Sequence, residues 1–155
     1  MRGYPGGMSR GVLFVALAPI VFLLAACGGS SAAPATCEPA LADAASVANL
    51  LAAYAELGNT LADGVQQVKY NRDAWAASSF RNIVAGRLQP SGDVGVWVMQ
   101  YNDTNGALMG VIPVNDVAKA AAPEGGPTNA DAVAAVSRVE GSDEAAAVIA
   151  CVEGA

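Results

Sequence analysis

The chain has 155 residues, and eight Lys and Arg residues against fourteen Asp and Glu residues give it a net charge of −6. This length suits one modest domain, and the acidic balance argues against nucleic acid as a partner. The chain contains no histidine, which excludes Ser-His-Asp and Cys-His catalysis. We therefore expect no catalytic residue, no cofactor and no metal site.

The first feature in chain order is an uncharged, mostly apolar run over residues 12–26, preceded by Arg2 and Arg10. The run is shorter than the roughly 20 residues that a membrane-spanning helix needs. Basic, apolar and small-residue regions follow one another here as they do in an export signal. The sequence therefore predicts a signal peptide over residues 1–26, whether the chain starts at Met1 or at Met8.

The run ends in Leu24–Cys27, "LAAC", which resembles the lipobox of bacterial lipoproteins. The resemblance implies that Cys27 carries the lipid, palmitate among its acyl chains, and that the mature chain is lipid-anchored at the outer face of the bacterial cytoplasmic membrane. Two or three acyl chains hold a protein at a membrane persistently. Residues 27–36, the lipidated cysteine and a Gly-, Ser- and Ala-rich stretch, have the composition of a flexible tether.

Two further cysteines, Cys37 and Cys151, lie near the two ends of the remaining segment, residues 37–155. Thiols of an exported protein are exposed to oxidising conditions, so an even pair predicts a disulfide that closes the domain. A metal site or a catalytic thiol is disfavoured because no histidine and no other thiol accompany the pair.

Helical spacing of apolar residues predicts a first helix over 39–57, and two more helices, one from residue 59 or 60 onward and one over 73–85. Two β-rich runs around Asn105-Gly106 then predict a β-hairpin of residues 94–101 and 107–114. Because a lone hairpin is only marginally stable, a third strand over residues 81–88 is the alternative to the last part of the third helix.

Short helices are predicted over the remaining segments 115–122, 129–139 and 143–152, the last with Ser142 as its N-cap. The predicted fold class is thus α+β: a small, mostly helical domain over residues 37–155 with a β-hairpin or a three-stranded antiparallel sheet, closed by one disulfide.

Within the hairpin, Trp97, Met99 and Tyr101 alternate onto one face of their strand. Such side chains are enriched at the centres of protein interfaces, so this face is a candidate binding surface. The alternative is burial of this face under the C-terminal helices, which the general tendency of large apolar side chains favours.

These features predict a membrane-anchored envelope lipoprotein that acts as a non-enzymatic binding or interaction module. Its expected contacts are the membrane, through Cys27, and a protein partner in the cell envelope. One alternative is an envelope hydrolase that uses two carboxylates within about 5 to 9 Å of each other. A lipoprotein with an exclusion function, encoded by a prophage, is the third hypothesis.

Overall fold

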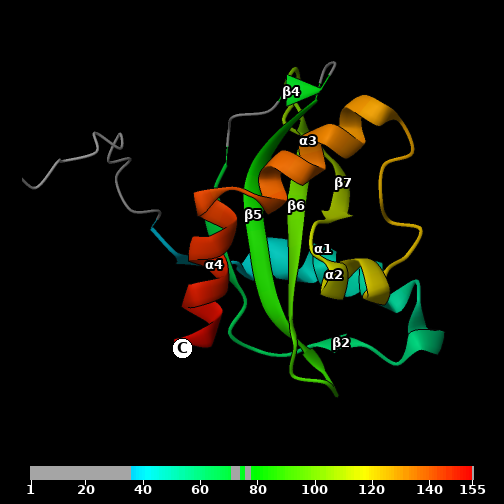
Figure 1. Cartoon of the computed structure of the whole chain (residues 1–155), viewed down its shortest axis with the longest axis vertical. Coiled ribbons are helices and arrows are strands. Elements are labelled where there is room, and N and C mark those ends of the chain that lie inside the picture. The colour runs from blue at the N-terminus through cyan, green and yellow to red at the C-terminus, as the bar shows by residue number, and fades with distance from the viewer. Residues whose placement is uncertain (1–35, 71–73, 76–77, 155) are drawn as a thin grey trace, which may run out of the picture. The chain divides into compact units, whose positions relative to one another are not determined.

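The computed structural model describes residues 36–154 apart from 71–73 and 76–77 (Figure 1). The predicted signal peptide, Cys27 and all of the predicted tether except Thr36 lie outside the described residues. In the part that is described, no helix is long and apolar enough to cross a membrane.

The centre of the fold is an antiparallel sheet with the strand order β1-β3-β5-β6-β7, and β2 and β4 also pair with β5. The longest strand, β5, pairs with β6 along most of its length, from Ser78 opposite Asn102 to Arg87 opposite Val94. The strands are β1 (Glu38–Pro39), β2 (Thr60–Leu61), β3 (Gln66–Lys69), β4 (Ala74–Trp75), β5 (Ser78–Gln89), β6 (Val94–Asn102) and β7 (Leu108–Pro113).

Helices cover both faces of this sheet. They are α1 (Leu41–Ala52), the short 3-10 helix η1 (Ala55–Leu57), α2 (Asp116–Ala121), α3 (Ala130–Glu140) and α4 (Asp143–Glu153). One core contains Trp97 and Met99 with residues of α1 and α2, and the other contains Phe80 and Ile83 with residues of α3 and α4. Figure 1 shows α3 and α4 on the near side of the sheet and α1 on its far side. The sheet is therefore the middle of three layers.

The predicted fold class, a mostly helical domain with a hairpin or a three-stranded sheet, is wrong, because the sheet dominates the fold. Residues predicted as the second and third helices form β2, β3, β4 and most of β5 instead, and the first helix is shorter, with Pro39 in a strand. A strand covered on both faces has no alternation of apolar and polar residues. Its apolar run cannot be told from a buried helix by periodicity alone.

Gly86 in β5 illustrates this packing. A Cβ atom at Gly86 would lie 2.7 Å from Cδ1 of Leu61, so glycine allows the segment around β2 to lie directly on β5. Such a close approach of two chain segments is a common use of glycine within a strand.

The hairpin is confirmed as β6 and β7, and the alternative third strand is confirmed within the longer β5. The three C-terminal helices are also found at their predicted places. The Ser142 hydroxyl accepts a hydrogen bond from the Ala145 N–H at 3.2 Å, so Ser142 is the N-cap of α4 as predicted.

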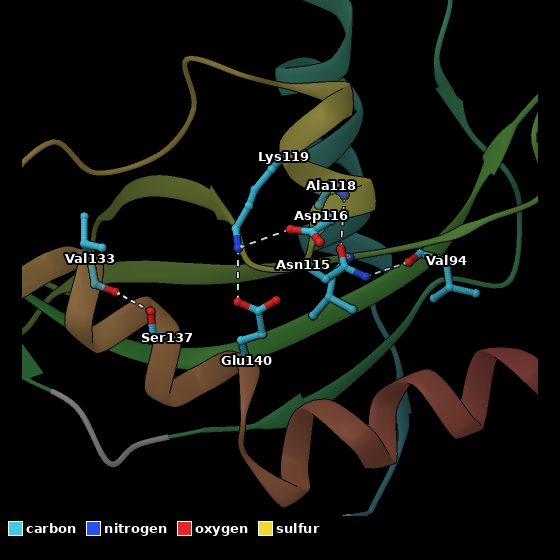
Figure 2. Close-up of polar contacts among 9 residues, drawn as sticks. Val94, Asn115, Asp116, Ala118, Lys119, Val133, Ser137 and Glu140 are labelled. Carbon is cyan, nitrogen blue, oxygen red and sulfur yellow. Dashed lines mark hydrogen bonds and ion pairs between the residues drawn. The ribbon is translucent and has the colours of Figure 1, made fainter.

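The side chains of Asn115 and Lys119 fix α2 to its surroundings (Figure 2). Asn115 Oδ1 accepts hydrogen bonds from the N–H groups of Val96 (3.0 Å) and Ala118 (3.1 Å), while its Nδ2 donates to the Val94 carbonyl (2.9 Å). Lys119 Nζ lies 3.0 Å from Glu140 Oε2. The start of α2 is thereby tied to β6, and its middle to the end of α3, a helix of the opposite face.

Candidate functional site

Two irregularities in strand pairing lie at the same end of the sheet. The register of β5 with β6 passes from Phe80 opposite Gln100 directly to Asn82 opposite Met99, so the strand bulges at Arg81. The register of β6 with β7 also shifts, from Gln100 opposite Gly110 to Tyr101 opposite Leu108. Such bulges redirect side chains and are common next to binding and catalytic sites.

A buried carboxylate lies beside the first of these bulges. Asp43 belongs to the first turn of α1 and is only 6% exposed. Its Oδ2 accepts a hydrogen bond from Asn82 Nδ2 at 2.7 Å, and its Oδ1 accepts one from the Tyr101 hydroxyl at 2.9 Å. Each carboxylate oxygen thus receives a donor, and the partial positive charge of the helix N-terminus further stabilises the anion.

Tyr101 connects this carboxylate to an arginine. Partial burial and the hydrogen bond to Asp43 raise the pKa of Tyr101 to about 12, so its phenol is protonated at neutral pH and donates. The guanidinium carbon of Arg81 lies 5.5 Å from the centroid of the Tyr101 ring, within the range of cation–π attraction. Arg81 Nη2 also lies 3.3 Å from Asp103 Oδ1.

A pocket of about 390 Å³ lies beside this cluster and is lined by Lys69, Arg81, Asn82 and Asp103. Lys69 reaches it because it stands opposite Asn82 in the pairing of β3 with β5, and directly paired residues share a face of the sheet. The pocket therefore combines two cations, an amide and a carboxylate that come from the two strands β3 and β5 and from the β6–β7 turn.

A larger hollow, of about 500 Å³, lies between α1 and residues 61–66, with Leu41, Ala44, Ala45, Ala48 and Val65 in its lining. Few polar side chains converge there. Ligand sites combine an apolar lining with a small number of placed polar groups. We therefore place the candidate functional site at the pocket backed by Asp43, Asn82, Tyr101 and Arg81, four residues that we call the Asp43 cluster.

The predicted disulfide is confirmed: Cys37 and Cys151 are bonded, with their Cα atoms 6.5 Å apart, and they join the start of β1 to α4. Cys27 lies outside the described residues. No group of three or more potential metal ligands of the types His, Cys, Asp and Glu occurs within residues 36–154 as far as these are described.

The candidate binding surface of Trp97, Met99 and Tyr101 is not present in the structure. Trp97 and Met99 are 0% exposed and belong to the core under α1 and α2, so they cannot form a contact surface in this fold. The alternative, burial, is the outcome, although the covering helices are α1 and α2 and not the C-terminal ones. Only Tyr101 contributes to the candidate site, through its hydroxyl and its ring.

Sequence reasoning missed Asp43, Asn82, Arg81 and Lys69 as site residues. One signal was available: Asp43, Val47 and Leu51 are spaced by four residues, which puts an acid on the buried stripe of α1. An acidic side chain at such a position needs donors. The other three residues meet only through strand pairing between β3, β5 and β6.

Comparison with known proteins gives no relative: no protein-family model, no curated protein and no solved structure matches the chain.

Proposed function

We propose that this protein is a lipid-anchored lipoprotein of the bacterial cell envelope, and that its domain is a non-enzymatic binding module for a small polar ligand. The anchor is proposed from the LAAC sequence that ends at Cys27. The observation that carries the binding function is the pocket of about 390 Å³ into which charged and amide side chains converge. Its volume is in the range of small-molecule sites.

The Asp43 cluster supports binding because it holds the pocket wall in one arrangement. Asp43 fixes the Asn82 amide and the Tyr101 ring through hydrogen bonds, and Tyr101 in turn lies under Arg81. A wall that is organised before the ligand arrives loses less conformational entropy on binding. An arginine that stacks on an aromatic ring is particularly suited to bind a ligand, because its planar guanidinium group can form two parallel hydrogen bonds to a carboxylate or phosphate.

The same cluster argues for positioning and against proton transfer. A general acid or base needs a pKa near the working pH. Burial and Asp43 raise the pKa of Tyr101 to about 12, far from neutrality. Both oxygens of Asp43 already accept hydrogen bonds from side chains of the protein. These groups are therefore better suited to hold a ligand than to activate a water molecule.

The test is to purify the full-length chain in a mild detergent, extract the small molecules that it retains and identify them by mass spectrometry. Arg81→Gln and Asn82→Ala should lose a molecule that the wild type and the control variant Glu124→Gln retain. Glu124 is exposed and lies in the loop between α2 and α3. Circular dichroism establishes that each variant is folded.

Two outcomes would count against this function. Identical extracts from wild type and pocket variants would show that the pocket does not select a ligand. Cleavage of a cell-wall polymer by the purified chain, lost in Asp43→Asn, would favour the carboxylate-dependent hydrolase instead.

A further inference from the structure

We propose that the pocket is an oxyanion site, which takes the carboxylate or phosphate group of a small ligand on Arg81 and Lys69, and that Asp103 competes with this ligand for Arg81. The inference rests on the proposed binding function and names the class of ligand and the group that regulates access to the pocket.

The charge distribution favours an anion at this place. The chain has a net charge of −6 and only eight Lys and Arg residues, yet two of these line one pocket. In an acidic protein, the surrounding field repels anions. The attraction for an anion therefore has to come from the two cations that line the pocket, Lys69 and Arg81.

Arg81 is held in an orientation that suits an oxyanion. The bulge takes it out of the register of β5, and the Tyr101 ring lies under its guanidinium group at 5.5 Å from the ring centroid. Asp43 holds that ring through the Tyr101 hydroxyl. A planar guanidinium group matches carboxylate and phosphate geometry with two parallel hydrogen bonds, which a lysine ammonium cannot reproduce.

Asn82 adds selectivity to the site. Only its NH₂ group can donate to Asp43, so the hydrogen bond from Nδ2 to Asp43 Oδ2 fixes which way the amide points. Its carbonyl oxygen consequently points away from Asp43 Oδ2, and Asn82 is one of the residues that line the pocket. This arrangement favours a ligand that carries a hydroxyl or amino group next to its oxyanion.

Asp103 occupies the position of a competitor. Its Oδ1 lies 3.3 Å from Arg81 Nη2, and the two side chains are 44% and 40% exposed. Solvent-exposed ion pairs of this kind contribute little stability and are screened by salt. A ligand that forms two hydrogen bonds to Arg81 can therefore displace Asp103, and removal of the Asp103 charge should strengthen binding.

The experiment is an NMR titration of the full-length chain in detergent micelles, in which inorganic phosphate or acetate is added at constant ionic strength. The Arg81 Nε–H and Asn82 side-chain amide signals are followed. Wild type should show saturable shifts, and Asp103→Asn should lower the Kd by up to about fivefold, the upper range for an exposed ion pair. Glu124→Gln, which removes one exposed charge outside the pocket, should leave the Kd unchanged.

Arg81→Gln should abolish the saturable shift of the Asn82 amide. If that variant does not fold, Arg81→Lys, which keeps the charge without the planar fork, should weaken phosphate binding. Micelles doped with phosphatidylglycerol or, as control, phosphatidylcholine identify the source of the oxyanion. Shifts with phosphatidylglycerol alone indicate a lipid headgroup, and their absence indicates a soluble anion.

Shifts that do not saturate, or that persist unchanged in the Arg81 variants, would overturn the oxyanion site. An unchanged Kd in Asp103→Asn would overturn the competition by Asp103. These failures are distinct from failure of the proposed function, because a chain that still retains an Asn82-dependent small molecule has a binding pocket of another ligand class.

Discussion

Replacement of Tyr101 by phenylalanine tests the Asp43 cluster most directly, because it removes one hydroxyl group and preserves the ring under Arg81. The hydroxyl donates to Asp43 Oδ1 at 2.9 Å, and Asp43 is 6% exposed. A buried charged acceptor that loses its donor costs about 1–3 kcal/mol. Since Tyr101 itself is only partly buried, we expect the lower part of this range, about 1–2 kcal/mol, in urea unfolding of the chain with its disulfide intact.

The matched control is Tyr54→Phe, at a tyrosine that is also partly buried and lies just after α1, outside the cluster. A double-mutant cycle of Tyr101→Phe with Asp43→Asn then measures the coupling of the two residues. If Tyr101→Phe destabilises the chain no more than Tyr54→Phe, or if the cycle gives no coupling energy, the Tyr101 hydroxyl does not stabilise Asp43.

The same variant has a pH signature. The folded chain raises the pKa of Tyr101 from 10.0 to about 12, so the folded state binds this proton more tightly than the unfolded state. The resulting stabilisation is complete below pH 10 and is lost as the pH rises from 10 to 12. Wild type should therefore lose more unfolding free energy than Tyr101→Phe over this interval.

The remaining predictions concern the core, the disulfide and the anchor. Trp97→Ala should destabilise the domain by about 3–5 kcal/mol in thermal or urea unfolding, because the ring is fully buried, and Trp97→Phe should destabilise it less. Nearly equal melting temperatures of wild type and Trp97→Ala would contradict the burial of the ring. Reduction of the Cys37–Cys151 bond should lower the melting temperature, because the two cysteines are 114 residues apart in the sequence. The chain-entropy model assigns about 4.7 kcal/mol of stabilisation to a closed loop of ~100 residues. An unchanged melting temperature, with reduction verified by alkylation and intact mass, would contradict a stabilising role of the disulfide. Cys27→Ala should abolish labelling by a clickable fatty acid, and equal labelling of this variant would exclude the lipoprotein hypothesis.

The parts of the fold that the sequence predicts correctly are those with local signals. The hairpin has a turn at Asn105-Gly106 between two β-rich runs, and Ser142 marks the beginning of α4. In the turn, Gly106 has a φ of +68°, a left-handed conformation that glycine adopts without strain. Such signals depend on residues close together in the chain, so they can be read without knowledge of the tertiary structure.

Most of the chain between residues 59 and 89 could not be predicted in this way, and the strand over residues 81–88 was expected only as an alternative to a helix. Its segments become strands because β5 pairs with β6 on one side and with β3 on the other, and helices cover both faces. Alanine and glycine in these segments give little intrinsic preference for a strand. Tertiary pairing therefore overrides the local propensity.

The candidate site was unpredictable for the same reason. Arg81 points to the pocket because one residue of β5 is skipped in the pairing with β6, and Lys69 lies opposite Asn82 because of the register of β3. Neither register can be deduced from residue spacing. For Trp97, Met99 and Tyr101, the alternation of side chains along the strand was predicted correctly. The sequence did not show that α1 and α2 cover this face of the strand.

The disulfide and the candidate site share one short segment of the chain. Cys37 is bonded to Cys151 in α4, the following residues form β1 against β3, and Ala40 donates its N–H to the Val65 carbonyl at 3.1 Å before α1 begins. Asp43, which holds the pocket residue Asn82 by a hydrogen bond, therefore lies only six residues after a covalent crosslink. If Cys27 is anchored as proposed, force from the membrane reaches the domain at this crosslinked point, where α4 and β3 share it. Under that proposal, the disulfide would shield the Asp43 cluster from load on residues 27–36, although these residues lie close to Asp43 in the sequence.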